Sequence, residues 1–135
     1  MDKQKVAAFA ERVFGDIGGF FAIGMAYLGV KTGLLAAMAA GAPMTLGDVI
    51  RETGLQPKYV EAWLKGMVSA EYLEYDPAAE TYRLPEEHAY LLASEGSDHY
   101  LGGIFYQAQA NMAMAERLAE AFFKGGGVPF EDYGA

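Results

Sequence analysis

Cysteine is absent from this 135-residue sequence, and basic residues are scarce. The absence of cysteine excludes disulfide bonds, thiolate metal sites and cysteine nucleophiles. Ten lysines and arginines stand against eighteen aspartates and glutamates, which gives a net charge of −8. Nucleic acids and anionic membrane surfaces both attract basic groups. The composition therefore disfavours both kinds of partner unless the few bases gather on one face.

A signal peptide and a long membrane-spanning run are also missing. The first residues, MDKQKVAAFAERVFGD, carry charges that interrupt any apolar segment. The longest uncharged run near them, IGGFFAIGMAYLGV (residues 17–30), is too short to span a bilayer and contains four glycines. The length suits one compact domain, and a cytoplasmic protein is expected.

The N-terminal segment has the periodicity of a helix. Apolar residues recur at helical spacing over residues 6–17, with charged residues on the other side. Residues 18–28 are apolar all round, which predicts burial on more than one face. Gly18, Gly19 and Gly24 weaken this helix by roughly 1 kcal/mol each relative to alanine. They are tolerable where another backbone approaches closely, from a partner helix or from a ligand.

The middle of the chain has the signals of a helix-turn-helix. A short helix is expected around Leu34 and Leu35. Thr45 and Asp48 nearly form a capping box for a second helix, which Gly54 suits as the C-terminal stop. Pro57 fits the first position of a third helix. That helix has an apolar stripe at i, i+3, i+4, i+7 and i+8, made of Val60, Trp63, Leu64, Met67 and Val68.

The second half begins with a hairpin and returns to helices. Residues 73–75 and 82–84 alternate between apolar and charged side chains around the turn DPAAE. A short helix is expected from Pro85 through Leu92, then a long final helix over residues 98–124, capped by Ser97. The order predicts a mainly α winged helix-turn-helix with a two-stranded β wing and additional N- and C-terminal helices. Residues 1–124 would form the domain and residues 125–135 a connector or tail.

The terminal helices predict an intertwined homodimer, because each helix alone would expose a broad apolar face. The sequences LGVKTGLLAAM, TLGDVIRETGLQPKYVEAWLKGMVSAEYLEYD and TYRLPEEHAYLL resemble the N-terminal winged-helix dimerisation domain of class I S-adenosylmethionine-dependent methyltransferases. The likeness is to bacterial small-molecule O-methyltransferases and covers about residues 22–92. The tail GGGVPFEDYG looks like the connector to the catalytic domain of such enzymes.

The resemblance implies a dimerisation and substrate-lid domain whose catalytic Rossmann-like half is absent from this chain. S-adenosylmethionine is implied for the parent protein, yet no glycine cluster here follows a buried strand as a cofactor-binding turn does. No catalytic, cofactor-binding or metal residue is assigned. His88 and His99 lack the spacing of a helical metal pair. Two alternatives stay open, a ligand-responsive winged-helix transcription regulator and a stand-alone dimer that binds a small hydrophobic ligand.

Aromatic and methionine side chains gather in the first and last helices. Most such side chains form core or dimer seam, but this combination also suits flat apolar ligands. In the methyltransferase relatives these helices lie over the acceptor cavity as a lid. The candidate pocket residues are Phe20, Phe21, Met25, Tyr27, Phe105, Tyr106, Gln109 and Met112.

The third helix is poorly equipped to read DNA. Lys58 and Lys65 are its outward bases, Glu61 lies among them, and no arginine or asparagine is placed for bidentate base contact. Four bases face nine acids over residues 43–90. DNA binding is therefore not expected, and the expected partners are a second copy and a small hydrophobic or aromatic molecule.

Overall fold

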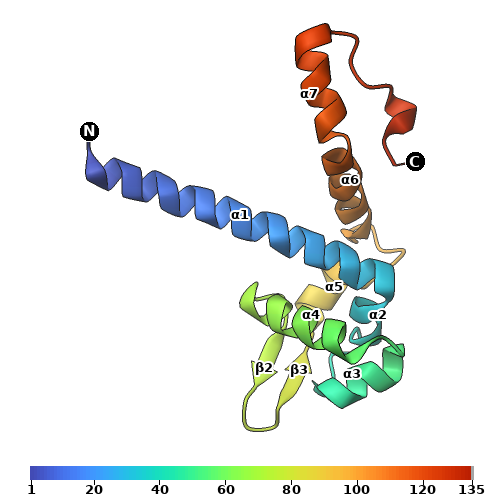
Figure 1. The fold of residues 1–135 in the computed structure, drawn as a ribbon. Coiled ribbons are helices and arrows are strands. Elements are labelled where there is room, and N and C mark those ends of the chain that lie inside the picture. Colours follow the sequence, from blue (N-terminus) through green and yellow to red (C-terminus); the bar gives the residue numbers. More distant parts are fainter. Residues whose placement is uncertain (135) are drawn as a thin grey trace.

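The fold of residues 1–134, described in a computed structural model, consists of helices around a small antiparallel sheet (Figure 1). The elements, in chain order, are α1 (Lys3–Thr32), α2 (Leu34–Ala37), β1 (Met44–Thr45), α3 (Leu46–Thr53), α4 (Pro57–Ser69), β2 (Glu74–Asp76), β3 (Thr81–Arg83), α5 (Glu86–Leu92), α6 (Gly102–Ala113), α7 (Ala115–Lys124) and the 3-10 turn η1 (Phe130–Asp132).

The helix-turn-helix has the termini that its sequence predicts. The side chain of Thr45 accepts a hydrogen bond from the backbone N–H of Asp48, at 3.1 Å. Asp48 in turn accepts from the backbone N–H of Thr45 at 2.9 Å, which completes the capping box of α3. Gly54 ends α3 in the left-handed region, at φ 67°, and Pro57 opens α4.

The wing has one strand more than predicted. The β2–β3 hairpin is confirmed, with Tyr75 opposite Tyr82. The residues that lead into α3 also pair with β3, so the sheet has the order β1-β3-β2, with Met44 opposite Tyr82. A two-residue strand is too short to show alternation, which is why periodicity did not reveal it.

One core joins these elements. α4 supplies four buried side chains, and α2, α3 and the wing close around them. Trp63 is buried, and its indole N–H donates to the backbone carbonyl of Met25 in α1 at 2.9 Å. This bond fixes α4 against α1. The largest fully buried side chains are Leu35, Met38, Leu64, Met67, Leu84, Val49 and Val60.

The C-terminal helices differ from the single long helix predicted over residues 98–124. α6 begins only at Gly102, after a loop in which the Leu101 N–H donates to the Leu91 carbonyl at 2.8 Å. Ser97 accepts from the N–H of His99 inside this loop, so it does not cap a helix. A second break comes at Met114, whose backbone (φ −92°, ψ 0°) separates α6 from α7.

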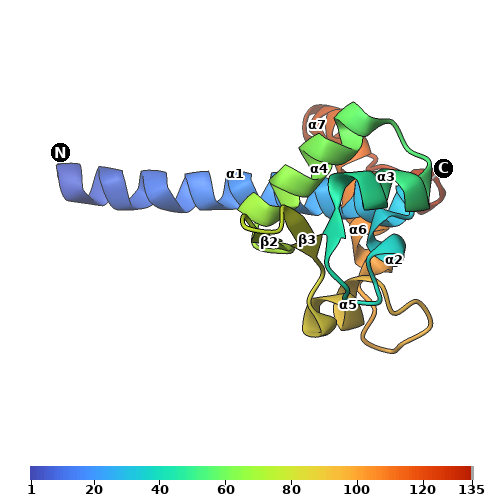
Figure 2. The same cartoon turned by 90° about the horizontal axis from the view of Figure 1, so that it is seen from below.

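The N-terminal half of α1 extends well beyond the rest of the fold, and α6 and α7 leave it in another direction (Figures 1 and 2). Every residue from Lys3 to Phe21 is exposed except Ala10, which is half-buried. The buried residues of the helix are Ala22, Ala26 and Gly29. The predicted burial of residues 18–28 on more than one face is therefore met in part: residues 22–27 pack against both α4 and α6, whereas residues 18–21 stay exposed because the helix extends beyond the core.

By length and composition alone, α1 is the one helix among residues 1–134 that is apolar enough to cross a membrane. Mostly buried core helices of soluble proteins and signal sequences near the N-terminus meet the same criterion, and 17% of the apolar window of α1 is buried. The N-terminal half of α1 is one-sided, with Lys5, Arg12 and Asp16 on the face opposite its apolar stripe. Such a helix is built to cover, or be covered by, an apolar surface on one side.

Candidate functional site

A groove between α1 and α6 brings together most of the candidate pocket residues. Its volume is about 220 Å³. Five of the eight predicted residues line it, namely Phe20, Tyr27, Phe105, Gln109 and Met112. The Gln109 amide and the Tyr27 hydroxyl are the polar groups among them, so the groove suits an apolar, flat molecule that offers a hydrogen-bonding group.

The other three candidates lie outside this groove. Tyr106 packs edge-on against Tyr27, with ring centroids 5.1 Å apart, and the Lys31 ammonium lies 5.8 Å from the Tyr106 ring centroid. Phe21 is 62% exposed on the outward face of α1. Met25 points to the opposite side, toward α4, where its methyl group lies against Gly66. Consecutive helix positions are about 100° apart, so Phe20 and Phe21 cannot both face α6.

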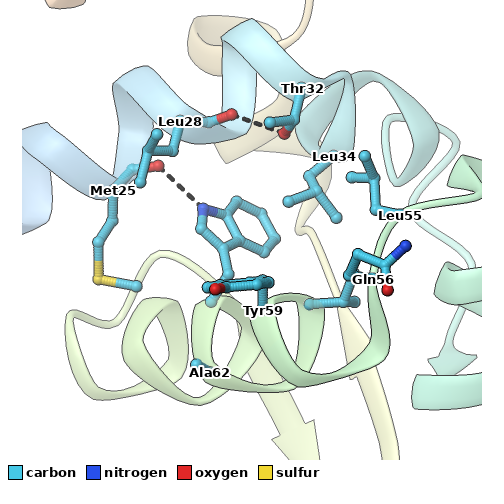
Figure 3. Close-up of a pocket in the computed structure, with 10 residues that line it drawn as sticks. Met25, Leu28, Thr32, Leu34, Leu55, Gln56, Tyr59 and Ala62 are labelled. Carbon is cyan, nitrogen blue, oxygen red and sulfur yellow. Dashed lines mark hydrogen bonds between the residues drawn. The ribbon is translucent and has the colours of Figure 1, made fainter.

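A larger groove, which the sequence did not reveal, lies between α1 and α4 (Figure 3). Its volume is about 580 Å³ and its walls are almost wholly apolar. Trp63, which is buried, and Tyr59, which is 71% exposed, both line it. The residues that line it are Met25, Leu28, Thr32, Leu34, Leu55, Gln56, Tyr59, Val60, Ala62 and Trp63.

The sequence contains one indication of this groove, namely two apolar residues that lie outside the core-facing stripes of their helices. Leu28 in α1 and Tyr59 in α4 lie beside their helices' core stripes, and both remain exposed in the folded chain. An exposed apolar groove between two helices is typical of a surface that binds a ligand or a partner, because its walls are removed from water only when the groove is occupied.

Neither groove is lined by the two histidines or by Tyr100, and the contacts of these three residues do not form a catalytic arrangement. The His88 Nδ1–H donates to the Tyr72 carbonyl at 2.7 Å, and His99 Nδ1 lies 2.9 Å from the Tyr90 hydroxyl. Burial raises the pKa of Tyr100, in the loop before α6, and nearby Glu95 adds to the shift. Among residues 1–134, no group of three or more histidine or carboxylate side chains is placed to hold a metal ion.

The electrostatics of α4 and the wing oppose a nucleic-acid interface. Lys65 forms an ion pair with Glu61 at 2.7 Å, and Arg83 forms one with Glu74 at 2.7 Å. Arg51 is held by Asp48 at 3.0 Å. Three of the four bases between residues 43 and 90 are thus engaged by acids of the same domain, which weakens their attraction for phosphate.

These features define a winged helix-turn-helix domain that is extended by helices at both ends. Residues 20–94 match the family described as the Rv2258c-like winged HTH domain. The match covers more than half of the chain, and the chain belongs to this family. Comparison with curated protein sequences finds no match.

The fold is shared with solved methyltransferase structures. It matches the N,N-8-amino-8-demethyl-D-riboflavin dimethyltransferase RosA from Streptomyces davawensis with a TM-score of 0.71 and 22% identity, over 89% of this chain and 35% of that one. For PigF with SAH the TM-score is 0.69 at 16% identity, over 84% and 33%. For an O-methyltransferase family 2 protein from Planctomyces limnophilus, solved with apigenin, it is 0.58 at 21% identity, over 90% and 35%.

The chain therefore spans about a third of the length of the methyltransferases it resembles. At these identities the likeness establishes the fold. It confirms the resemblance to the winged-helix domain of methyltransferases that the sequence motifs indicated.

Proposed function

We propose that the chain is the dimerisation and substrate-lid module of a cytoplasmic S-adenosylmethionine-dependent methyltransferase. The observation that carries the proposal is the α1–α6 groove, in which aromatic and methionine side chains surround one amide on a methyltransferase-like scaffold. In this role the module closes an apolar acceptor pocket against a separate cofactor domain.

The mechanism of such a module is positional. A lid that excludes water and orients the acceptor brings it to the methyl donor in a reactive geometry, without taking part in bond making. The aromatic rings of Tyr27 and Phe105 would stack on a flat acceptor, and the Gln109 amide would orient it by a hydrogen bond.

The cofactor is assigned to the other domain. S-adenosylmethionine supplies the methyl group, and its recognition in the Rossmann-like fold needs a glycine-rich turn directly after a strand. The glycine cluster of residues 15–24 lies inside α1 and that of residues 125–127 follows α7, so neither has that context. This chain's own residues are proposed to contact the acceptor alone.

The competing proposal, a DNA-binding regulator, requires free bases on α4 and the wing. The ion pairs of Lys65 and Arg83 with acids of the same domain argue against it. A stand-alone ligand-binding dimer would use the same groove, and the two proposals differ in whether a catalytic domain accompanies the chain.

The reading frame beyond residue 135 separates these possibilities. The methyltransferase proposal expects it to encode a strand that ends in an acidic residue and a glycine-rich turn. A stop codon at that point, with no separately encoded methyltransferase domain that binds the chain, would contradict the proposal and leave the stand-alone ligand-binding dimer.

A further inference from the structure

An apolar seam runs along the outward face of α1, between the side that contacts α6 and the side that contacts α4. Its residues alternate intervals of four and three, the spacing by which one helix packs along another. We define the α1 seam as Ala10, Phe14, Ile17, Phe21, Gly24 and Leu28. Phe14 is 72% exposed and Phe21 62%, so residues 1–134 leave these seam positions uncovered.

We propose that the α1 seam pairs with the α1 seam of a second copy of this chain, with the two helices antiparallel. This inference rests on the proposed function, because it specifies how the dimerisation module pairs. The register places Phe14 against the partner's Gly24, Ile17 against the partner's Phe21, and Ala10 against the partner's Leu28.

The sizes of the seam residues select this direction and register. In the antiparallel arrangement two of the facing pairs combine a large side chain with a small one. Phe14 enters the space above the partner's Gly24, and Leu28 meets the partner's Ala10. No described atom lies within 4 Å of a Cβ built on Gly24, which lies at the edge of the α1–α6 groove, so the space above it is open to a partner. In a parallel pair in register, Phe14 would face Phe14 of the partner subunit and Gly24 would face Gly24 of the partner subunit. The two phenylalanines would be overpacked, and a void would remain between the two glycines.

The exposed area is what a stable dimer needs. The four phenylalanines on and beside the seam, at residues 9, 14, 20 and 21, are 54–72% exposed. At about 200 Å² for each whole ring, they offer on the order of 500 Å². Val6, Val13, Ile17 and Leu28 add roughly 300 Å². The total of about 800 Å² per chain is the exposed apolar area available, including Phe20 at the α1–α6 groove, and it reaches the area that each partner buries in an interface of standard size.

The same pairing covers the exposed rim of the α1–α4 groove. Leu28 belongs both to the seam and to the groove wall, and Met25 and Thr32 lie beside it on the groove side (Figure 3). When a partner helix runs antiparallel along the seam, the part of it around Ala10 lies over this rim. A parallel partner in register would instead bring its own Leu28 end to this rim. A two-fold axis also makes the two contacts identical, which closes the assembly at two copies.

Engineered disulfides test the register directly, because the full chain has no cysteine of its own. Positions 14 and 24 are about 15 Å apart along one helix, too far to join within a chain. The double variant Phe14→Cys/Gly24→Cys is therefore expected to form a covalent dimer on mild oxidation, while each single variant does not. Arg12→Cys/Gly24→Cys, with its first cysteine on the charged face, is the matched control. Trp63 fluorescence reports whether each variant is folded.

Two glycines give a second, independent measurement. Gly24→Leu fills the space that Phe14 of the partner subunit would occupy, and is expected to raise the dimer dissociation constant about tenfold or more. Gly19→Leu adds the same side chain on the opposite face of α1, again with no described atom within 4 Å, and is expected to leave that constant unchanged.

Each remaining outcome overturns a defined part of the account. Covalent dimers from Phe14→Cys alone would show a parallel seam and overturn the register. A dimer in light scattering that none of these cysteines captures would overturn the inference and leave the proposed dimerisation standing. A monomer at high concentration would overturn both. A monomer that co-sediments with phosphatidylcholine vesicles would show that lipid, and not a second copy, covers the seam.

Discussion

Gly29 is the position where a single methyl group should damage the fold most clearly. A Cβ built on Gly29 would lie 2.6 Å from Cζ2 of the Trp63 indole and 3.0 Å from Leu35. The indole cannot move away freely, because it is buried and its N–H is bonded to the Met25 carbonyl. To restore an ordinary carbon–carbon contact, the ring would have to retreat by roughly 0.8 Å.

The magnitude follows from two opposing effects. Replacing glycine by alanine inside a helix stabilises the helix by roughly 1 kcal/mol, and this gain applies equally at Gly29 and at Gly19 in α1. Overpacking a core costs about 1–3 kcal/mol, and only Gly29→Ala incurs it. Gly19→Ala, where no described atom lies within 4 Å of the added carbon, is the matched control. The free energy of unfolding should therefore be about 1–3 kcal/mol lower for Gly29→Ala than for Gly19→Ala.

Urea unfolding followed by the fluorescence of Trp63, the only tryptophan, measures this difference. Both variants must be compared at one protein concentration, because dimerisation would make stability depend on concentration. If Gly29→Ala proves as stable as Gly19→Ala, the close contact between α1 and Trp63 that organises this fold is refuted.

Three further predictions concern α3 and the surface of α4 and the wing. Thr45→Ala removes the N-cap of α3 and should lower the free energy of unfolding by about 1 kcal/mol, measured in the same urea titration. Hydrogen bonds from the backbone N–H and then the side chain of Thr45, followed by one from Arg51, hold the pKa of Asp48 below its ordinary value. The stability that Asp48 adds should be present above that ordinary pKa and disappear as the pH falls through the lowered one, and Asp48→Asn should abolish this dependence in acid titrations. Micromolar chain should not shift duplex DNA in a gel at low salt; a salt-dependent shift would revive the regulator hypothesis.

The helix-turn-helix was predictable because its signals are local. The capping box of Thr45 and Asp48, the left-handed Gly54 and Pro57 at the start of α4 each act within a few residues, and all are confirmed. The strand β1 and the break at Met114 were not predictable in this way. The first depends on pairing with β3, which is distant in sequence, and the second interrupts an apolar pattern that continues across it.

The candidate site was predictable in part for the same reason. The gathering of aromatic and methionine side chains in the first and last helices indicated the candidates, and packing of α1 against α6 brings Tyr27, Phe105 and Gln109 together. The α1–α4 groove depends on how two helices cross, a property that neither helix encodes by itself. The placement of Met25 toward α4 follows from that crossing.

The central claim is that the α1–α6 groove forms part of an acceptor pocket, and a kinetic measurement on the complete methyltransferase tests it most directly. The account predicts that Tyr27→Ala and Gln109→Ala raise the KM for the acceptor about tenfold, the loss of roughly one stacking or hydrogen-bonding contact, and leave the KM for S-adenosylmethionine unchanged. Tyr59→Ala, in the α1–α4 groove, should change neither. An unchanged acceptor KM in both groove variants, with methyl transfer intact, would contradict the account.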